Sequence, residues 1–240
     1  GRLMTPYSDA AGPAGAHRAE RLRPMVELEP GPITLAGDLY LLMVSDVTGR
    51  LRVQPRVAGY ALAGALLIEL LALGNLSVDR QQIRILGRVP PVDALHQRLW
   101  GRLLVEPEPV GLGDTIAAMG MTAVAEVAER LVVARWLRRD QRRRLVSRTV
   151  RYPPVYRNAV FWRAGRLAGQ LAHHPERYDL VLFGLLDAAG FAATALRDNP
   201  LLSSEHLRRA AHRLLGQCPQ PAELIGQVRT LTARVTTTPR

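Results

Sequence analysis

Apolar residues recur at helical spacing along most of this chain, and the pattern predicts a mainly α-helical fold with short peripheral β-hairpins. Thr34 precedes the first such run and is a suitable N-cap, because its hydroxyl oxygen can accept a hydrogen bond from a first-turn N–H. Residues 57–73 form the most apolar stretch, but this stretch is short for a membrane span and contains Glu69. We therefore expect a buried central helix, which Gly74 ends in a left-handed conformation.

The remaining elements follow from apolar periodicity and from turn and cap residues. In chain order we expect a turn at 46–49, a short strand through Leu51 and Val53, a β-hairpin from 76–78 and 83–86, a helix from Pro91, a helix capped by Asp114 or Thr115, a basic β-hairpin at 145–150, a buried apolar stretch at 178–196, a helix capped by Ser203 or Ser204, and a last helix from Pro221. Residues 1–30 contain four prolines and lack apolar periodicity, so they are expected to be a disordered N-terminal arm. Residues 31–240 are expected to form a single helical domain.

Composition is ordinary for a globular protein, with 48% hydrophobic and 22% charged residues, so the chain can bury a sizeable core. Cys218 is the only cysteine, which excludes an intrachain disulfide and gives no indication of an oxidising compartment. The first residues contain no apolar signal-peptide region. All 32 basic residues are arginine, a usage typical of a GC-rich, bacterial genome. We therefore expect a soluble, cytoplasmic protein of bacterial type.

The positive charge is concentrated in one segment. Residues 130–166 contain twelve arginines and one acid, Asp140, so their net charge of +11 equals that of the whole chain. Such a patch attracts anionic partners, and near an anionic bilayer each arginine contributes roughly 1 kcal/mol. Nucleic acid would be attracted by the same field. The segment is therefore the main candidate for a binding surface.

No nucleotide-binding or metal-binding signature is evident. The string Gly111-Leu112-Gly113 begins like a dinucleotide fingerprint, but position 116 is Ile and no good strand precedes it. His173 and His174 are adjacent, so they would point apart on a helix and have no partner at metal-ligand spacing. We expect no metal and no cofactor.

Two single residues were considered as catalytic groups. Cys218 has no basic neighbour in sequence that would lower its pKa, so it is more typical of a small buried core residue than of a nucleophile. Glu69 is an acid in an apolar helix, for which a structural ion pair or hydrogen bond is favoured over a catalytic role. No Ser, His and Asp residues have the spacing of a recognisable catalytic triad, and we expect no enzymatic activity.

Four strings, in the same order and at the same distances, resemble the Golgi phosphoprotein 3 family. They are Leu39-Tyr40-Leu41-Leu42 through Asp46-Val47-Thr48-Gly49-Arg50, then Leu66-Leu67-Ile68-Glu69-Leu70 with Gly74 and Leu76, then Val127-Ala128-Glu129-Arg130-Leu131 before a basic turn, a hairpin and Tyr152-Pro153, and finally the apolar helix from Leu180 to Ala192 with its Ala188-Ala189-Gly190. Together they cover residues 32–235. The second string is the most specific of the four.

The resemblance implies a helical fold with a peripheral β-hairpin. It also implies binding of phosphatidylinositol 4-phosphate and of glycosyltransferase tails, as in the eukaryotic members. The family's lipid pocket uses a tryptophan, which aligns with Gln54, and three arginines, which align with Ala63, Ala125 and Ala128. The apolar tip of the family's membrane hairpin aligns with the more basic residues 144–147. We therefore expect the fold to be shared and the phosphoinositide pocket to be lost, so that another anionic head group or a protein tail is bound.

The leading hypothesis is a non-enzymatic adaptor on the inner face of the membrane, which recognises anionic lipid head groups. The candidate lipid- or anion-binding residues are Arg138, Arg139, Arg142, Arg143, Arg144, Arg148, Arg151, Arg50, Arg52 and Arg56. The candidate membrane-contact residues are Leu145, Val146, Val150 and Tyr152. The expected partners are anionic membrane lipid and a protein client tail, and self-association into a homo-oligomer is left open.

Two alternative functions use the same arginines. A nucleic-acid-binding protein is less favoured, because no known binding motif accompanies the patch, although aromatic residues are interleaved with it. The other alternative is a scaffold that binds acidic protein.

Overall fold

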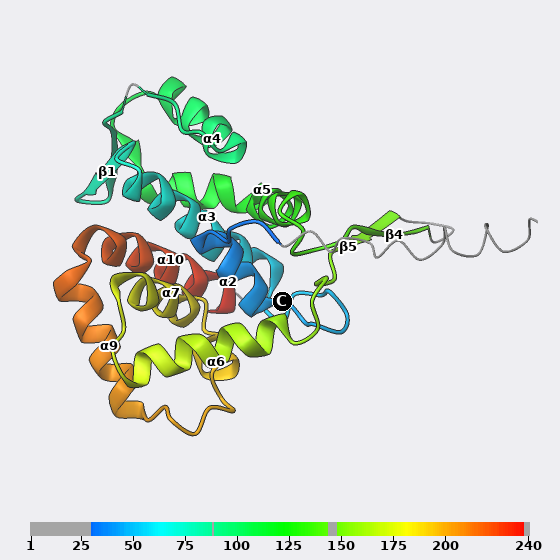
Figure 1. The fold of residues 1–240 in the computed structure, drawn as a ribbon. Helices are drawn as coiled ribbons and strands as arrows, with labels where there is room; N and C mark the ends of the chain where they lie inside the picture. The colour runs from blue at the N-terminus through cyan, green and yellow to red at the C-terminus, as the bar shows by residue number, and fades with distance from the viewer. Residues whose placement is uncertain (1–29, 88, 144–147, 238–240) are drawn as a thin grey trace, which may run out of the picture. The chain divides into compact units, whose positions relative to one another are not determined.

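Helices make up most of the described chain, and the most apolar of them lies at its centre (Figure 1). The computed structural model describes residues 30–87, 89–143 and 148–237. The helices are α2 (Leu35–Met43), α3 (Pro55–Ala72), α4 (Ala94–Val105), α5 (Leu112–Val133), α6 (Ala159–Ala172), α7 (Arg177–Ala188), α8 (Ala192–Ala195), α9 (Ser204–Gln217) and α10 (Pro219–Thr237). The strands are β1 (Leu76–Asp79), β2 (Gln82–Ile85), β3 (Val110–Gly111), β4 (Asp140–Arg143) and β5 (Arg148–Arg151).

This element order confirms the expected mainly helical fold with small β-hairpins. Residues 31–240 cluster as one compact unit. The expected disordered arm at 1–30 lies, except for its last residue, outside the described residues.

Helix α3 is the centre of the core, as expected for the most apolar stretch. Every residue from Val57 to Leu70 is buried, because α2, α5, α7 and α10 all pack against this helix. A Cβ added to Gly59 would lie 2.2 Å from the carbonyl oxygen of Gly120, so α3 and α5 cross in direct backbone contact. Among the described helices, α3 alone has the length and apolar composition of a membrane span, but 78% of it is buried inside the domain. Its apolar surface is therefore buried in the core of the domain and is not available to a membrane.

Helix boundaries were predicted well where one side chain determines them. The Thr34 hydroxyl oxygen accepts a hydrogen bond from the Gly37 N–H at 3.3 Å and caps α2. Ser203 caps α9 in the same way, with the His206 N–H as donor at 3.3 Å. Gly74 has φ +76° after the end of α3. These three predictions are confirmed.

Because of a third strand, α5 begins earlier than predicted. The hairpin of β1 and β2 is confirmed, with Val78 opposite Ile83, and β3 adds to the free edge of β2. The Leu112 N–H then donates to the Gln81 carbonyl at 2.9 Å, and α5 begins at once. The predicted cap at Asp114 or Thr115 is wrong, because strand pairing, and no side chain, sets the first residue of this helix.

Other boundaries also differ from the predicted ones. The strand expected through Leu51 and Val53 is a single bridge from Val44 to Leu51, since α3 begins at Pro55. The apolar stretch at 178–196 is divided into α7 and α8 by Gly190, which has φ +67°.

Three helix starts were shifted or missed. The helix expected from Pro91 begins at Ala94, with Asp93 as its N-cap, and the last helix begins at Pro219 and not at Pro221. Helix α6 was not predicted, because arginines interrupt the narrow apolar face that includes Val160 and Leu167.

The basic hairpin of β4 and β5 projects from the helical body (Figure 1). Its first strand begins at Asp140, before the predicted range of 145–150, and residues 144–147 lie outside the described residues. Strand β5 ends at Arg151, directly before Tyr152-Pro153-Pro154, as predicted from the inability of proline to donate to a strand ladder.

Candidate functional site

The arginine-rich segment 130–166 extends over several elements and does not form one uniform surface. It includes the end of α5, the hairpin of β4 and β5, the connection after the hairpin, and the first half of α6. The connection is fixed to the end of α5 by two backbone hydrogen bonds. In these, the Arg138 N–H donates to the Pro153 carbonyl at 3.0 Å and the Val155 N–H donates to the Trp136 carbonyl at 2.9 Å. The base of the hairpin is therefore a defined structure.

Among the arginines of the segment whose side chains the structure describes, four form ion pairs with acids that the charge count along the sequence could not connect to them. Arg130 pairs with Glu69 and Asp93, Arg139 with Glu129, Arg163 with Asp38, and Arg166 with Asp179. These five acids all lie outside the segment. The charge available for a partner is therefore smaller than +11.

Two other arginines line one cleft at the base of the hairpin. Arg138 and Arg157 are both exposed, and neither forms an ion pair with another described residue. The cleft has a volume of about 590 Å³, and Asp46 and Val47 from the turn after α2 form its opposite side. One oxygen of Asp46 accepts the Val160 N–H at 3.2 Å, at the start of α6. With two guanidinium groups and one carboxylate, the cleft has a net positive charge.

Two exposed apolar side chains line this cleft, and two more follow shortly after it in the chain. Val47 and Val155 line it and are 89% and 48% exposed. The first turn of α6 follows directly and presents Phe161 and Trp162, which are 65% and 69% exposed. Their rings meet edge to face with centroids 5.9 Å apart. Positive charge and apolar surface thus lie side by side, and aromatic rings of this kind favour the interfacial zone of a bilayer.

The candidate anion-binding residues Arg50, Arg52 and Arg56, which lie near Gln54 in the sequence, do not come together in the structure. Arg50 is exposed in the turn that precedes Leu51. The Arg52 guanidinium lies over the Phe191 ring at 5.2 Å, whereas Arg56 donates to the Tyr60 hydroxyl at 2.8 Å. Arg52 and Arg56 line different clefts, and neither lines the cleft of Arg138 and Arg157.

The other candidate residues lie on or beside the hairpin. Arg142, Arg143 and Arg148 belong to its strands, but their side chains are outside the described part, and Arg144, Leu145 and Val146 are outside it altogether. Arg139 is engaged by Glu129, Arg151 is half-buried, and Val150 is 41% exposed.

Tyr152, expected to contact the membrane, is bonded within the protein. Its ring packs against the core and its hydroxyl donates to Glu129 at 2.7 Å. Burial, together with this hydrogen bond to a carboxylate, raises the pKa of Tyr152 to about 12. The same bond, with help from Arg139 and against the effect of burial, lowers the pKa of Glu129. The structure therefore gives Tyr152 the role of fixing the end of β5 to α5.

Of the aromatic residues interleaved with the arginines, Trp136, Tyr152 and Tyr156 are engaged within the protein, whereas Phe161 and Trp162 are exposed. Trp136 donates its ring N–H to the Gly31 carbonyl at 2.9 Å and packs edge-on against Tyr156. The Arg163 guanidinium covers the Trp136 ring at 4.5 Å. These groups are already stacked on one another, which does not favour base stacking by them.

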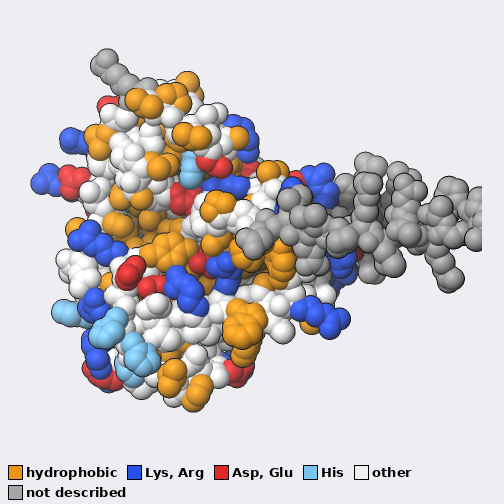
Figure 2. Space-filling model, viewed as in Figure 1, with side chains coloured by type: hydrophobic (Ala, Val, Ile, Leu, Met, Phe, Trp, Pro, Cys, Tyr) orange, Lys and Arg blue, Asp and Glu red, His pale blue; other side chains and the backbone are white. Residues whose placement is uncertain are grey.

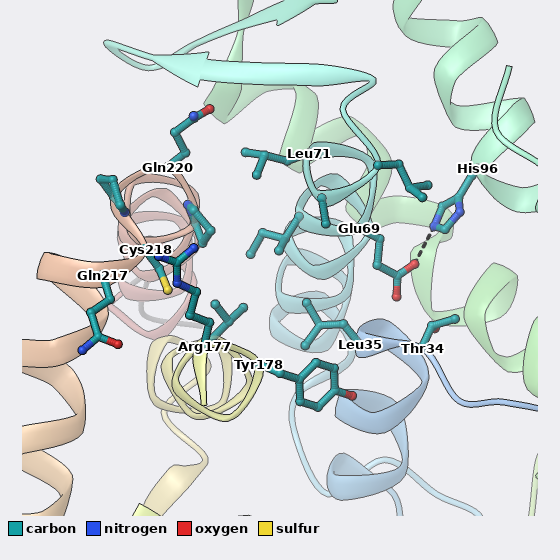
Figure 3. A pocket seen from close by; sticks show the side chains of 16 residues that line it. Thr34, Leu35, Glu69, Leu71, His96, Arg177, Tyr178, Gln217, Cys218 and Gln220 are labelled. Atoms are coloured by element: carbon teal, nitrogen blue, oxygen red, sulfur yellow. Dashed lines mark hydrogen bonds and ion pairs between the residues drawn. The ribbon is translucent and has the colours of Figure 1, made fainter. Parts of the chain in front are cut away.

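Glu69 is the centre of a buried polar network that joins four helices. Figure 3 shows its contact with His96. One carboxylate oxygen accepts from the Ala36 N–H at 2.7 Å and from Arg130 at 3.2 Å. The other contacts His96 at 2.5 Å and Arg130 at 2.9 Å. Arg130 also donates to the Thr34 hydroxyl at 2.5 Å. These contacts join α2, α3, α4 and α5.

The network explains the acid in the apolar helix. Burial alone would raise the pKa of Glu69, but the hydrogen bond from His96 and the positive charge of Arg130 outweigh it and lower that pKa. The structural ion pair expected for Glu69 is confirmed. The sequence showed that Glu69 required a partner, but gave no signal that His96 and Arg130 supply it.

The residues set aside as catalytic or metal-binding groups have ordinary environments. Cys218 is buried, as expected, and burial raises the pKa of its thiol. His173 and His174 are exposed, and the ring of His173 contacts the Gly169 carbonyl at 2.9 Å. Within the described residues, no group of three or more His, Cys, Asp or Glu side chains is placed to hold a metal ion.

The fold and this arrangement define a mainly helical domain with a basic peripheral hairpin. The family model of Golgi phosphoprotein 3 (GPP34) matches residues 35–228. The chain belongs to that family. No curated protein matches the chain.

The positions that align with the family's lipid pocket carry no cation here. Ala63 and Ala128 are fully buried, whereas Gln54 and Ala125 are exposed. An arginine at either buried position would require a different packing of α3 and α5. The basic cleft at Arg138 and Arg157 is a separate place on the domain, lined by other segments.

Proposed function

We propose that the protein is a non-enzymatic, peripheral membrane-surface adaptor that binds anionic lipid head groups at the base of the β4–β5 hairpin. The observation that carries this proposal is the cleft in which Arg138 and Arg157, both without an ion pair to a described residue, lie beside the exposed Val47. Guanidinium groups bind phosphate oxygens in a bidentate manner, which suits a lipid phosphate. The neighbouring apolar side chains suit the interfacial zone above it.

The proposal places the protein in the cytoplasm, on the inner face of the membrane, where anionic lipids give the surface a negative potential. The arginines of β4 and β5 would add long-range attraction, and the cleft would supply the contact. The absence of catalysis is part of the proposal. It is supported by the Glu69 network, in which the carboxylate and His96 are both engaged by structural partners.

The test is vesicle flotation at several salt concentrations, with anionic and with neutral vesicles. We expect binding to anionic vesicles only, and we expect it to weaken steeply with salt, because exposed charges are screened over about 8 Å at physiological ionic strength. A duplex-DNA mobility shift at matched salt tests the nucleic-acid alternative. Tighter binding to DNA than to anionic vesicles would contradict the membrane role.

Two sets of variants separate the cleft from the hairpin. The double variant Arg138→Gln, Arg157→Gln removes the charge of the cleft, and Arg142→Ser, Arg143→Ser, Arg144→Ser removes charge from the hairpin. Both should weaken vesicle binding. The double variant Arg84→Gln, Arg209→Gln changes two exposed arginines elsewhere and serves as the matched control. Equal binding by the parent and both test variants would overturn the proposal.

A further inference from the structure

An apolar cavity opens between the last turn of α3 and the junction of α9 and α10. Its volume is about 640 Å³, which falls in the range of roughly 300–1,000 Å³ that is usual for small-molecule sites. Figure 2 shows hydrophobic side chains gathered in a hollow on this side of the domain. Six helices contribute to the wall, largely with the apolar residues Leu35, Ile68, Leu71, Val181, Cys218 and Pro219. The cavity is distinct from the hairpin cleft.

The mouth of the cavity exposes apolar side chains that no other part of the described chain covers. Leu73 lines the cavity and is 58% exposed, and Ala72 beside it is also exposed. They lie at the end of α3, beyond its buried part, which ends at Leu70. An apolar ligand would remove this surface from water at about 25 cal/mol per Å².

Most polar groups around the cavity already have partners. Glu69, His96 and Thr34 belong to the buried network, whose carboxylate is neutralised by Arg130. The Tyr178 hydroxyl donates to Asp38 at 2.8 Å, and the Gln220 side-chain oxygen accepts the Val78 N–H at 2.8 Å. These groups stabilise the wall and have little capacity left for a ligand.

Arg177 is different from these groups. It lies at the start of α7, and Figure 3 shows its side chain directed toward Cys218 across the cavity. Its charge acts on the Cys218 thiol, where it lowers the pKa against the larger, raising effect of burial. It forms no hydrogen bond or ion pair with a described residue. The cavity therefore combines an apolar wall with one cation that has no anionic partner.

We propose that this cavity binds a single-chain amphipathic anion, with the apolar chain along α3 and α10 and a carboxylate or phosphate head on Arg177. An anionic head gives Arg177 the charge-assisted hydrogen bonds that it lacks, and the chain covers Leu71 and Leu73. A cationic amphiphile would be repelled by Arg177, and a neutral one would form no charge-assisted hydrogen bond with this exposed guanidinium. The proposal does not depend on the membrane contact of the hairpin.

The binding test uses dodecanoate and dodecyl phosphate below their micellar concentrations, with dodecanol and dodecyltrimethylammonium for comparison. Calorimetric titration should give one site for at least one of the two anions and weaker binding of the neutral and cationic probes. Affinity should rise about fourfold for each CH₂ added between octanoate and dodecanoate. Binding of dodecanoate but not of dodecyl phosphate, or the reverse, would identify the head group that Arg177 accepts.

Cys218 supplies a readout that is specific to this cavity, because it is the only cysteine of the chain. Its alkylation by iodoacetamide should slow when the anion is bound. Arg177→Gln should weaken binding of the anion about tenfold and leave that of dodecanol unchanged. Ala72→Phe and Leu73→Gln, both at exposed positions, should weaken binding of all the chains.

Arg84→Gln is the control, and thermal melting establishes that each variant is folded. Equal affinity of the parent and Arg177→Gln for the anions, or unchanged alkylation of Cys218 with the anion bound, would overturn the proposal. Equal binding of the dodecyl cation would overturn it as well.

Discussion

Arg130 and Arg138 lie eight positions apart in one basic segment, yet they occupy opposite environments. The Arg130 side chain is 12% exposed and is held by Glu69, Asp93 and Thr34. Arg138 is exposed and lines a cleft with Arg157, without an ion pair to a described residue. The comparison shows that a run of like charges is not a functional unit. Acids far away in sequence decide which arginines stabilise the fold and which remain available to a partner.

The largest effect should come from breaking the buried network. Glu69→Gln removes the charge that compensates Arg130, and a buried pair that loses one partner typically costs about 3–5 kcal/mol. We expect the free energy of unfolding to fall by about 3 kcal/mol and Tm to fall by about 10 °C. Glu205→Gln, which changes an exposed ion pair with Arg208, is the control and should have almost no effect. Equal stability of the two variants would show that the network is not structural.

Breaking the ion pair of Arg163 should lower the free energy of unfolding by a smaller amount. Asp38 is buried and accepts from Arg163 at 2.6 Å and from the Tyr178 hydroxyl at 2.8 Å. Asp38→Asn weakens both bonds, but the Arg163 side chain is nearer the surface, and we expect about 2 kcal/mol from urea unfolding. Asp187→Asn, at the more exposed pair with Arg229, is the matched control. A loss larger than that of Glu69→Gln would reverse the order of the two sites.

Lowering the pH should remove the contribution of Glu69 to the free energy of unfolding. Because its pKa is lowered in the folded protein, the contribution is complete above the ordinary glutamate pKa of about 4.3 and is lost as the pH falls through the folded value. The stability difference between the parent and Glu69→Gln should therefore shrink below about pH 4, by no more than about 1.4 kcal/mol per pH unit. Urea unfolding of both proteins from neutral to acidic pH measures it. A difference that stays constant throughout would contradict the assignment.

The smallest effect on stability is expected at the available arginines. Arg138→Gln with Arg157→Gln should change the free energy of unfolding by less than about 0.5 kcal/mol, because exposed charges contribute little to folding. The same variant should weaken binding to anionic vesicles. A variant that is clearly destabilised would show that these two side chains also support the fold, and the contrast with Arg130 would disappear.

The fold could be predicted from the sequence where its determinants are local. Thr34, Gly74 and Ser203 set helix ends through one side chain or one backbone angle, and the largely apolar sequence of α3 identified the centre of the core. The two-residue strand β3 could not be predicted in this way, because only pairing with β2 defines it.

The candidate site could be predicted only as a region. The charge count located the basic segment, but it could not separate Arg163, paired with a carboxylate 125 positions earlier, from Arg157, which forms no ion pair with a described residue. Nor could it show that Arg52 and Arg56 turn to different partners at the start of α3. The apolar cavity is lined by six helices, so no local pattern in the sequence predicts it.

The position of α10 has a consequence for how the chain folds during synthesis. This helix packs on α3, α5 and α7, and its first residues bond back to the hairpin of β1 and β2 across 142 positions, from Gln220 to Val78 and from Glu223 to Gln81. A ribosome releases the chain from its N-terminal side, so α3 emerges long before the helix that covers it. Until then its leucines are open to aggregation, and we expect the nascent chain to depend on a chaperone until α10 has been made.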